Sequence, residues 1–532
     1  MPDRATVVEA LGALGCAPDG PTGLEELSVE ALMNRPDLFS LEGIARALRP
    51  FLGLGAPPSY APRAGGLEFL VDETVLAIRP EVSVGLVRGV ALDEAGLARL
   101  LDTQGKLDLT YGRKRARVSI GLHDAAPLKG PITYKAVPPE SASFAPLAAD
   151  GAERSPARSL AAILEGHPKG REYAHLLAGK PRYPLLVDAA GEVLSMPPII
   201  NGRLTELKAG RRDVFIDVTG TSRDAVTACA RLLAMLLADR GGAVETVKVL
   251  RPGEPSAFEP DLSARVHRVG LPAASRLLGV PLRADEAALA LERLGHRASV
   301  VPGGASLDVL VPPWRFDILH EADLIEDIAI GLGYSSLPSR LPRRPTLGAE
   351  HPLASARRRL RAALLGLGFL EVMTLTLGAP ETPAGSRPAS TVAHPLSREH
   401  SALRTTLVPS LLAVLAANTH RDLPQALFEE GEVVEGASNA PRVAALYLGA
   451  EASFTRAKGV ALALFEGLGL AATFEAADLP PFTRGRAARA LVGGRPLLTL
   501  GELKPETLAA YSLAHPAFAL ELDLGAVPAP AP

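Results

Sequence analysis

The stretch Pro312–Tyr334, PPWRFDILHEADLIEDIAIGLGY, constrains the fold more than any other part of this chain. Two prolines follow the apolar run Leu307–Val311. They predict the end of a short strand, because proline has no N–H to donate and fixes its own backbone angle. After a short linker, Leu324, Ile325 and Ile328 recur at helical spacing. The chain is therefore expected to pass from a strand into a helix that packs one face on a core.

Acidic residues gather on this predicted helix. Asp323, Glu326 and Asp327 stand at i, i+3 and i+4 and so share one helical face, and Asp317 lies just before the helix. Carboxylates packed together repel one another unless a cation or a basic partner neutralises them, and hard oxygen donors suit Mg²⁺. The same spacing is also typical of the solvated side of an amphipathic helix. The residues alone favour the solvated face over a metal site.

The stretch resembles the PPWRxDI…DLIEE-type signature of the β subunit of phenylalanine–tRNA synthetases. In that family its acids contribute to a magnesium site shared with the α subunit. The resemblance implies that Asp317, Asp323, Glu326 and Asp327 are the magnesium ligands here. Asp327 stands where the family usually has Glu, which keeps the charge but shortens the reach by one methylene.

Composition indicates an ordinary globular protein. The 532 residues suffice for three or four domains, with 47% hydrophobic and 22% charged residues. The sequence has no apolar run of membrane-spanning length and no basic N-terminal region before an apolar signal core. Cys16 and Cys229 fall in different predicted domains, so neither a disulfide framework nor a zinc site is expected. A cytoplasmic protein is predicted.

Net charge limits the contacts with nucleic acid. A formal charge of −3 argues against general affinity across the whole surface. Local basic clusters, such as the one between Arg357 and Arg361, fit either a solvated face or a limited track of tRNA contacts. Charge therefore does not decide between these interpretations.

An α+β multidomain architecture is predicted. Residues 1–66 are expected to form an N-terminal structural domain, and residues 262–338 a small helix-and-strand domain that carries the acidic helix. The resemblance implies a mixed α/β editing domain at residues 67–260. It also implies a class II synthetase-like antiparallel sheet domain, without the active site, at residues 349–532. Further predicted elements are the strands Val118–Leu122, Tyr183–Asp188, Glu192–Ser195, Asp213–Thr219 and Glu371–Leu377, and the helix Ala354–Leu367.

The sequence lacks the usual motifs for nucleotide chemistry. It has no GxxxxGK[ST] loop, no GxGxxG between a strand and a helix, and no HExxH or nucleophile elbow. A GxGxxR-type segment with an ATP-binding arginine near the end is missing too. His394–Pro424 instead resembles the catalytic-like module of the same β subunit, which has lost its active-site residues. ATP and L-phenylalanine are therefore expected to bind the partner α subunit.

Segments in the second predicted domain resemble the archaeal and eukaryotic form of this subunit: His167–Leu177, Gly191–Asn201 and Phe215–Thr221. In the family this domain hydrolyses tyrosine wrongly attached to tRNA(Phe). The physical need is plain, because a hydrophobic pocket for Phe rejects an analogue with an added hydroxyl by only about 10². A second site can supply polar partners that phenylalanine would leave unpaired.

The matching motifs place the editing pocket at Leu186, Ser195, Asp217 and Thr219. Asp217 and Thr219 alternate on one strand face, as residues that line one pocket must, although a strand end with locally satisfied polar groups explains them as well. Asp108 stands where relatives usually have a histidine, so editing here could be altered. No general base is assigned.

The resemblance implies a phenylalanine–tRNA ligase β subunit in a two-α, two-β assembly. The chain would support the α subunit, lend acids to magnesium, contact tRNA(Phe) and proofread. Two other functions remain open: a free-standing hydrolase of mischarged tRNA, and a non-catalytic RNA-binding scaffold.

Overall fold

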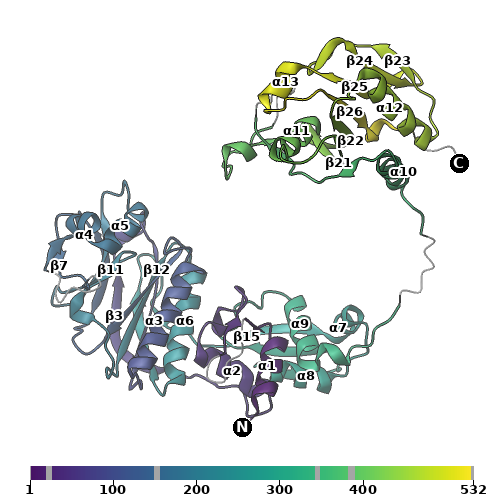
Figure 1. Cartoon of the computed structure of the whole chain (residues 1–532). Helices are drawn as coiled ribbons and strands as arrows, with labels where there is room; N and C mark the ends of the chain where they lie inside the picture. Colours follow the sequence, from purple (N-terminus) through teal and green to yellow (C-terminus); the bar gives the residue numbers. More distant parts are fainter. Residues whose placement is uncertain (1, 20–26, 149–155, 342–347, 381–389, 529–532) are drawn as a thin grey trace. The chain divides into compact units, whose positions relative to one another are not determined.

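The computed structural model describes residues 2–19, 27–148, 156–341, 348–380 and 390–528. The chain forms two compact units, Met1–Leu341 and Pro342–Pro532 (Figure 1). Both units mix helices with sheets, as the predicted α+β class requires. Within the described ranges, no helix is long and apolar enough to cross a membrane.

A ten-stranded sheet forms the centre of the first unit, and β14 (Ala257–Glu259) pairs with β13 outside its main path. In spatial order the other strands are β11 (Ile200–Asn201), β10 (Val193–Met196), β9 (Tyr183–Val187), β6 (Ile132–Val137), β3 (Arg63–Val71), β13 (Ala243–Leu250), β4 (Glu81–Arg88), β12 (Val214–Gly220) and β5 (Val118–Asp124). The predicted strands at 118–122, 183–188, 192–195 and 213–219 are thereby confirmed, with ends shifted by one or two residues.

Alternation along β12 divides its side chains between the two faces of the sheet. Ile216 and Val218 pack with the helices α3 (Glu94–Leu109) and α6 (Arg223–Asp239) in one apolar cluster. Phe215 packs in a different cluster, with β3, β4 and β6. Because successive side chains on a strand point to opposite faces, Asp217 and Thr219 lie on the Phe215 face, away from α3 and α6. The short helices α4 (Leu160–Gly166) and α5 (Pro168–Tyr173) follow the two-stranded sheet of β7 (Ser143–Phe144) and β8 (Arg158–Ser159).

A three-stranded sheet and three helices form a second core in this unit. The strands are β15 (Arg265–Gly270), β17 (Ser306–Val311) and β16 (Arg297–Val300), and the helices are α7 (Leu271–Leu278), α8 (Ala284–Arg293) and α9 (Glu321–Leu332). Leu324, Ile325 and Ile328 of α9 are buried in this core, as predicted. The strand-to-helix passage predicted at Pro312 is confirmed.

The N-terminal region packs near this core. It contains α1 (Arg4–Ala13), the short pair β1 (Ala17–Pro18) and β2 (Val29–Glu30), the single turn η1 (Pro36–Leu38) and α2 (Leu41–Phe51). The Ser40 hydroxyl accepts a hydrogen bond from the Gly43 N–H and so caps α2, because the first N–H groups of a helix lack partners within it. Phe51 of α2 packs with Leu294, which directly follows α8.

The second unit is built on a seven-stranded sheet. In spatial order its strands are β18 (Leu370–Glu371), β21 (Gln425–Glu435), β22 (Ser438–Leu448), β26 (Ala517–Asp523), β25 (Arg495–Leu503), β24 (Phe482–Val492) and β23 (Thr473–Ala476). The helices α10 (Pro352–Gly366) and α12 (Phe454–Leu468) cover one face, and α11 (Val408–Ala417) covers the other. Pairing is antiparallel throughout except between β18 and β21.

The predicted strand Glu371–Leu377 is wrong. Only β18 and the short β19 (Leu377–Gly378), which pairs with β20 (Ala402–Leu403), are strands, and residues 372–376 between them are not. Met373 and Leu375 stay 93% and 66% exposed, so the apolar pattern there does not record burial within this chain.

Candidate functional site

A cavity of about 390 Å³ opens on the Phe215 face of the large sheet. We call it the β12 cavity. Its lining residues are Gln104, Arg115, Ser119, Ile120, Gly121, Leu147, Ala148, His167, Pro168, Lys169, Ser195, Pro197, Pro198, Ile199, Ile200, Asn201 and Asp217. Two of the four predicted pocket residues, Ser195 and Asp217, therefore meet at one cavity although 22 positions separate them in the sequence.

Asp217 reaches the cavity because the neighbouring strand has a glycine beside it. Gly121 on β5 is its register partner, and a Cβ on Gly121 would lie only 1.9 Å from Asp217 Oδ2. Any larger residue at 121 would displace the carboxylate. Asp217 is 2% exposed, so it needs polar partners.

His123 provides one of those partners. Its Nε2 lies 2.6 Å from Asp217 Oδ2, and its Nδ1 lies 2.7 Å from the hydroxyl of Thr205, in the single turn η4 (Arg203–Thr205). All three side chains are at most 2% exposed. Sequence reasoning missed His123 and Thr205. The signal for His123 was its alternation with Gly121 on β5, but only the strand register brings it to Asp217.

Ser195 provides a second polar atom at the cavity. It lies on β10 and is 2% exposed, and its Oγ is buried without a hydrogen-bond partner in the part of the chain that the structure describes. A buried hydroxyl without a partner is costly. It is therefore a group that a ligand in the cavity could satisfy.

The other two predicted pocket residues, Leu186 and Thr219, do not line the cavity. Leu186 is fully buried in the sheet core, directly opposite Ser195 in strand register. The Thr219 hydroxyl and carbonyl accept hydrogen bonds from Arg79 Nε and Nη2, at 3.0 and 2.6 Å. Burial lowers the pKa of Arg79 to about 10. The hydroxyl and carbonyl of Thr219 are thus engaged by Arg79. Leu186 instead supports the strand that carries Ser195.

Asp108 organises one wall of the cavity. Its carboxylate accepts hydrogen bonds from Arg115 Nε at 3.1 Å and from the Ile120 N–H at 3.2 Å. Burial raises the pKa of Asp108 to about 6, although Arg115 opposes the shift. Arg115 also donates to the Ile199 carbonyl at 2.9 Å and lies 4.5 Å from the Tyr173 ring centre. Asp108 thus provides an ion pair that fixes Arg115.

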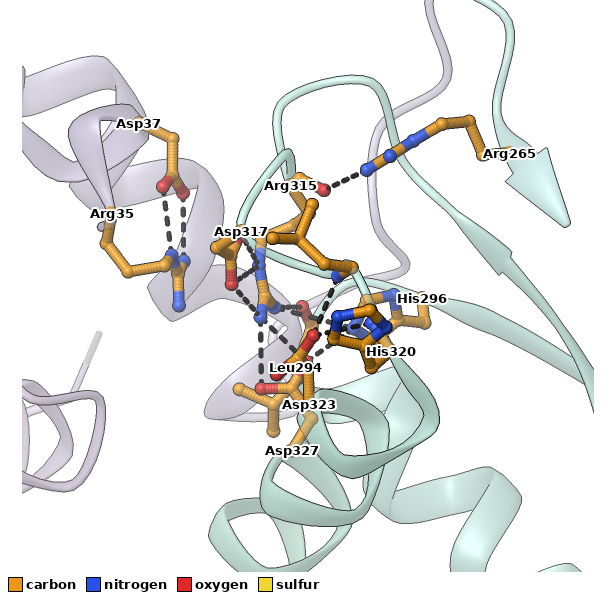
Figure 2. A network of polar contacts seen from close by, with 11 residues as sticks. Arg35, Asp37, Arg265, Leu294, His296, Arg315, Asp317, His320, Asp323 and Asp327 are labelled. Atoms are coloured by element: carbon orange, nitrogen blue, oxygen red, sulfur yellow. Dashed lines mark hydrogen bonds and ion pairs between the residues drawn. The ribbon is translucent and has the colours of Figure 1, made fainter. Parts of the chain in front are cut away.

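The acidic stretch surrounds a buried arginine rather than an open site (Figure 2). Arg315 Nη2 lies 2.8 Å from Asp317 Oδ2 and 2.8 Å from Asp327 Oδ2. Burial opposes the charge of both Arg315 and Asp327, yet their contact raises the pKa of Arg315 and lowers that of Asp327. Two of the four predicted ligands are therefore neutralised by a side chain of the same stretch.

The other two acids have different surroundings. Asp323 Oδ2 accepts hydrogen bonds from the N–H groups of Leu319 and His320, both at 2.7 Å, at the start of α9. Glu326 is exposed, with no hydrogen bond or ion pair among the described residues. Across the ranges that the structure describes, no three His, Cys, Asp or Glu side chains are grouped to hold a metal ion. The four carboxylates thus do not fit Mg²⁺ in this chain by itself, and magnesium shared with another subunit stays a prediction.

Further charged residues extend this cluster into the N-terminal region. Arg35 Nη2 and Asp37 Oδ2 pair at 2.8 Å, and both residues are buried. Burial would raise the pKa of Asp37, but Arg35 and then Arg315 hold it below its usual value. His296 Nε2 lies 2.6 Å from Asp327 Oδ2, and burial lowers the pKa of His296. Arg35 and Asp37 of the N-terminal region are thus linked electrostatically to Arg315 and Asp327.

Comparison with known proteins identifies the family of the chain. A family model described as "Phenylalanyl tRNA synthetase beta chain CLM domain" matches residues 337–524, and the "tRNA synthetase B5 domain" matches residues 268–334. Phenylalanine–tRNA ligase beta subunits of Archaeoglobus fulgidus and Methanosarcina acetivorans are 38% and 37% identical. Each alignment covers 98% of this chain and 95% of the relative.

A solved structure agrees with these relatives. It is the crystal structure of an N-terminal fragment of the phenylalanyl-tRNA synthetase beta subunit from Pyrococcus horikoshii, 34% identical with a TM-score of 0.59. The match covers 62% of this chain and 95% of that fragment. The resemblance noted in the sequence is confirmed across nearly the whole length, and the chain belongs to the phenylalanine–tRNA ligase β-subunit family, with archaeal relatives.

Proposed function

We propose that the β12 cavity hydrolyses tyrosine wrongly attached to tRNA(Phe), while a separate α subunit binds ATP and L-phenylalanine and forms the ester. The observation that carries this proposal is that a buried carboxylate, Asp217, and a buried hydroxyl, Ser195 Oγ, line the same cavity, and that this hydroxyl has no hydrogen-bond partner among the described residues. A phenolic hydroxyl can bond to both groups. Phenylalanine would leave Asp217 Oδ1 and Ser195 Oγ without a hydrogen bond, and such a mismatch supports rejection by about 10⁴–10⁵.

Basic side chains at the cavity suit the other end of the proposed substrate. Arg115 and Lys169 both line it, and a positive wall attracts the phosphates of a tRNA terminus. No side chain is assigned as the hydrolytic base. The tRNA is proposed to be tRNA(Phe), encountered in the cytoplasm.

Proofreading is expected to depend on pH through Asp108. As the pH falls through about 6, Asp108 takes up a proton and Arg115 loses its charged partner. We expect kcat/KM for Tyr-tRNA(Phe) to fall by about tenfold below that pH, after subtraction of uncatalysed hydrolysis. In Asp108→Asn, kcat/KM for Tyr-tRNA(Phe) should be low at every pH and should show no fall near pH 6. An unchanged step in Asp108→Asn would assign it to another group.

An exposed apolar surface in the second unit supports the proposed α-subunit partner. Leu370 of β18 and the following Met373 and Leu375 are 64%, 93% and 66% exposed. β18 is also an outer strand of its sheet. Contiguous apolar surface at a strand edge marks association sites, because unpaired edges otherwise lead to aggregation. We therefore propose this surface as part of the α-subunit interface, in an assembly of two α and two β subunits.

The isolated chain should not catalyse phenylalanine-dependent ATP–pyrophosphate exchange, and added α subunit should restore it. Met373→Asp with Leu375→Asp should abolish restoration, because two charges would be buried at the interface. Leu462→Asp, at an apolar position of α12 that is 47% exposed, is the matched control and should restore normally. Exchange by the chain alone would contradict this division of labour.

The two other functions make different predictions in the same preparations. A free-standing hydrolase would proofread as a monomer and ignore the α subunit in a size measurement. A scaffold would bind RNA or the α subunit without any deacylation. The exposed apolar surface disfavours the first, and the buried Asp217 and Ser195 at the cavity disfavour the second.

Aminoacyl-tRNA ligases generally use magnesium. We propose that any magnesium ion at the acidic stretch of this chain needs ligands from the α subunit, with Glu326 as the free carboxylate available for sharing. Asp317, Asp323 and Asp327 would have to leave their present partners to join it.

Magnesium should therefore leave the isolated chain unaffected. We expect the same unfolding midpoint with added magnesium and with EDTA, because Arg315 already neutralises the buried acids. Fluorescence of Trp314, the single tryptophan, reports on this region directly. A clear rise in the midpoint with magnesium would show that the four acids can hold the ion without a partner.

A further inference from the structure

Thr205, His123 and Asp217 form a linear chain of hydrogen bonds that ends at the β12 cavity. The two links measure 2.7 and 2.6 Å, and Asp217 alone of the three lines the cavity. Phe215 holds the imidazole from the side, with ring centres 6.1 Å apart. Asp217 thus receives support from two residues that do not line the cavity themselves.

With Asp217 ionised and His123 neutral, the chemistry of the three groups gives the direction of both bonds. An ionised carboxylate only accepts, so His123 Nε2 must carry the proton that it donates to Asp217 Oδ2. A neutral imidazole then has a bare Nδ1, which accepts from the Thr205 hydroxyl. The Thr205 proton therefore selects the imidazole tautomer that can hold Asp217.

We propose that Thr205 and His123 are positioning residues that set the specificity of this site for hydroxyl-bearing aromatic acyl groups. The inference rests on the proposed proofreading function. His123 engages Oδ2, and among the described residues nothing hydrogen-bonds Oδ1. Oδ1 remains an acceptor in a fixed place, so the group that it recognises must be a donor. A phenolic hydroxyl meets that requirement and an unsubstituted phenyl ring does not.

The local packing shows that this arrangement has little room to adjust. A Cβ on Gly121 would lie 1.9 Å from Asp217 Oδ2 and 2.7 Å from His123 Nε2. The Asp217 carboxylate and the His123 imidazole thus make contact in the space that a side chain at position 121 would fill. Loss of the Thr205 hydroxyl would free the imidazole to take its other tautomer, with no proton on Nε2 for Asp217.

The test compares hydrolysis of Tyr-tRNA(Phe) and Phe-tRNA(Phe) by the assembled α–β enzyme. Thr205→Val keeps the shape of the side chain and removes only the hydroxyl. It should lower kcat/KM for Tyr-tRNA(Phe) by roughly tenfold and leave the slow hydrolysis of Phe-tRNA(Phe) unchanged. Thr205→Ser should restore the tyrosyl rate. Thr103→Val is the matched control, because Thr103 is equally buried but bonds within α3, and it should change neither rate.

A second comparison separates positioning from simple loosening of the fold. In an Asp217→Ala background, adding Thr205→Val should have no further effect, because Thr205 acts only through Asp217. A wild-type tyrosyl rate in Thr205→Val, or an equal fall for both substrates, would overturn the inference while leaving proofreading intact. A wild-type enzyme with no preference for Tyr-tRNA(Phe) would instead refute the proposed function itself.

Discussion

Replacing Asp217 by Ala should slow deacylation of Tyr-tRNA(Phe) roughly a hundredfold and leave phenylalanine charging nearly intact. The loss arises because the carboxylate is the charged acceptor at the cavity, while charging is proposed to occur on the α subunit. The experiment therefore compares the loss of deacylation with any loss of phenylalanine charging. Both are followed on one preparation of assembled enzyme with one batch of tRNA.

Asp213→Ala is the matched control for that experiment. Asp213 directly precedes β12, but it pairs with Arg88 and the Gly89 N–H instead of lining the cavity. Its replacement should leave deacylation within about twofold of the wild type. Unchanged deacylation in Asp217→Ala would remove Asp217 from the site, and equal losses in both variants would indicate general damage to the strand.

Arg315→Met should lower the free energy of unfolding of the first unit by about 3–5 kcal/mol. The guanidinium is 2% exposed and contacts two carboxylates, so its removal leaves buried negative charge without a counter-charge. Denaturant unfolding followed by Trp314 fluorescence measures the loss. Arg268→Met removes an ion pair of similar geometry with Asp308 at the surface and should leave the unfolding midpoint nearly unchanged.

Acid should reduce the difference in the free energy of unfolding between Arg315→Met and the wild type. In the wild type the pKa values of Asp37 and Asp327 are lowered, so their stabilisation is complete above about pH 4, their unfolded pKa, and is lost as the pH falls further. Without Arg315, burial should raise the pKa of Asp327 in the folded state, whereas Asp37 keeps Arg35 as its counter-charge. The variant should therefore gain stability as the pH falls from neutral towards 4. A constant difference across this range would contradict the electrostatic explanation.

Local patterns in the sequence predicted the strands around the cavity well. Alternation at Asp217 and Thr219 correctly placed both side chains on one face of β12. The pattern did not reveal that Arg79, 140 positions away, would occupy Thr219, or that His123 would hold Asp217. Those contacts depend on strand order, which short sequence segments do not encode.

The acidic helix shows the same limit. The spacing of Asp323, Glu326 and Asp327 correctly predicted a helix, but not one shared environment, because neighbours one residue apart are rotated by about 100° around the helix axis. Asp327 is consequently buried while Glu326 is exposed. Arg315 lay in the same stretch, and its role as counter-charge required the tertiary fold.

The strand predicted at Glu371–Leu377 failed for a different reason. Its alternating apolar residues have the pattern of a half-buried strand, but Met373 and Leu375 face solvent in this chain. Apolar residues in a sequence reflect burial in the assembled protein, including burial against another subunit. The proposed α-subunit interface would explain that pattern.

The most direct measurement is the rate at which the wild-type assembled enzyme hydrolyses Tyr-tRNA(Phe) and Phe-tRNA(Phe) under identical conditions. The polar groups at the β12 cavity predict rapid release of tyrosine and little release of phenylalanine. Equal rates for the two esters, or no hydrolysis of either above the uncatalysed background, would contradict the assignment of this cavity to proofreading.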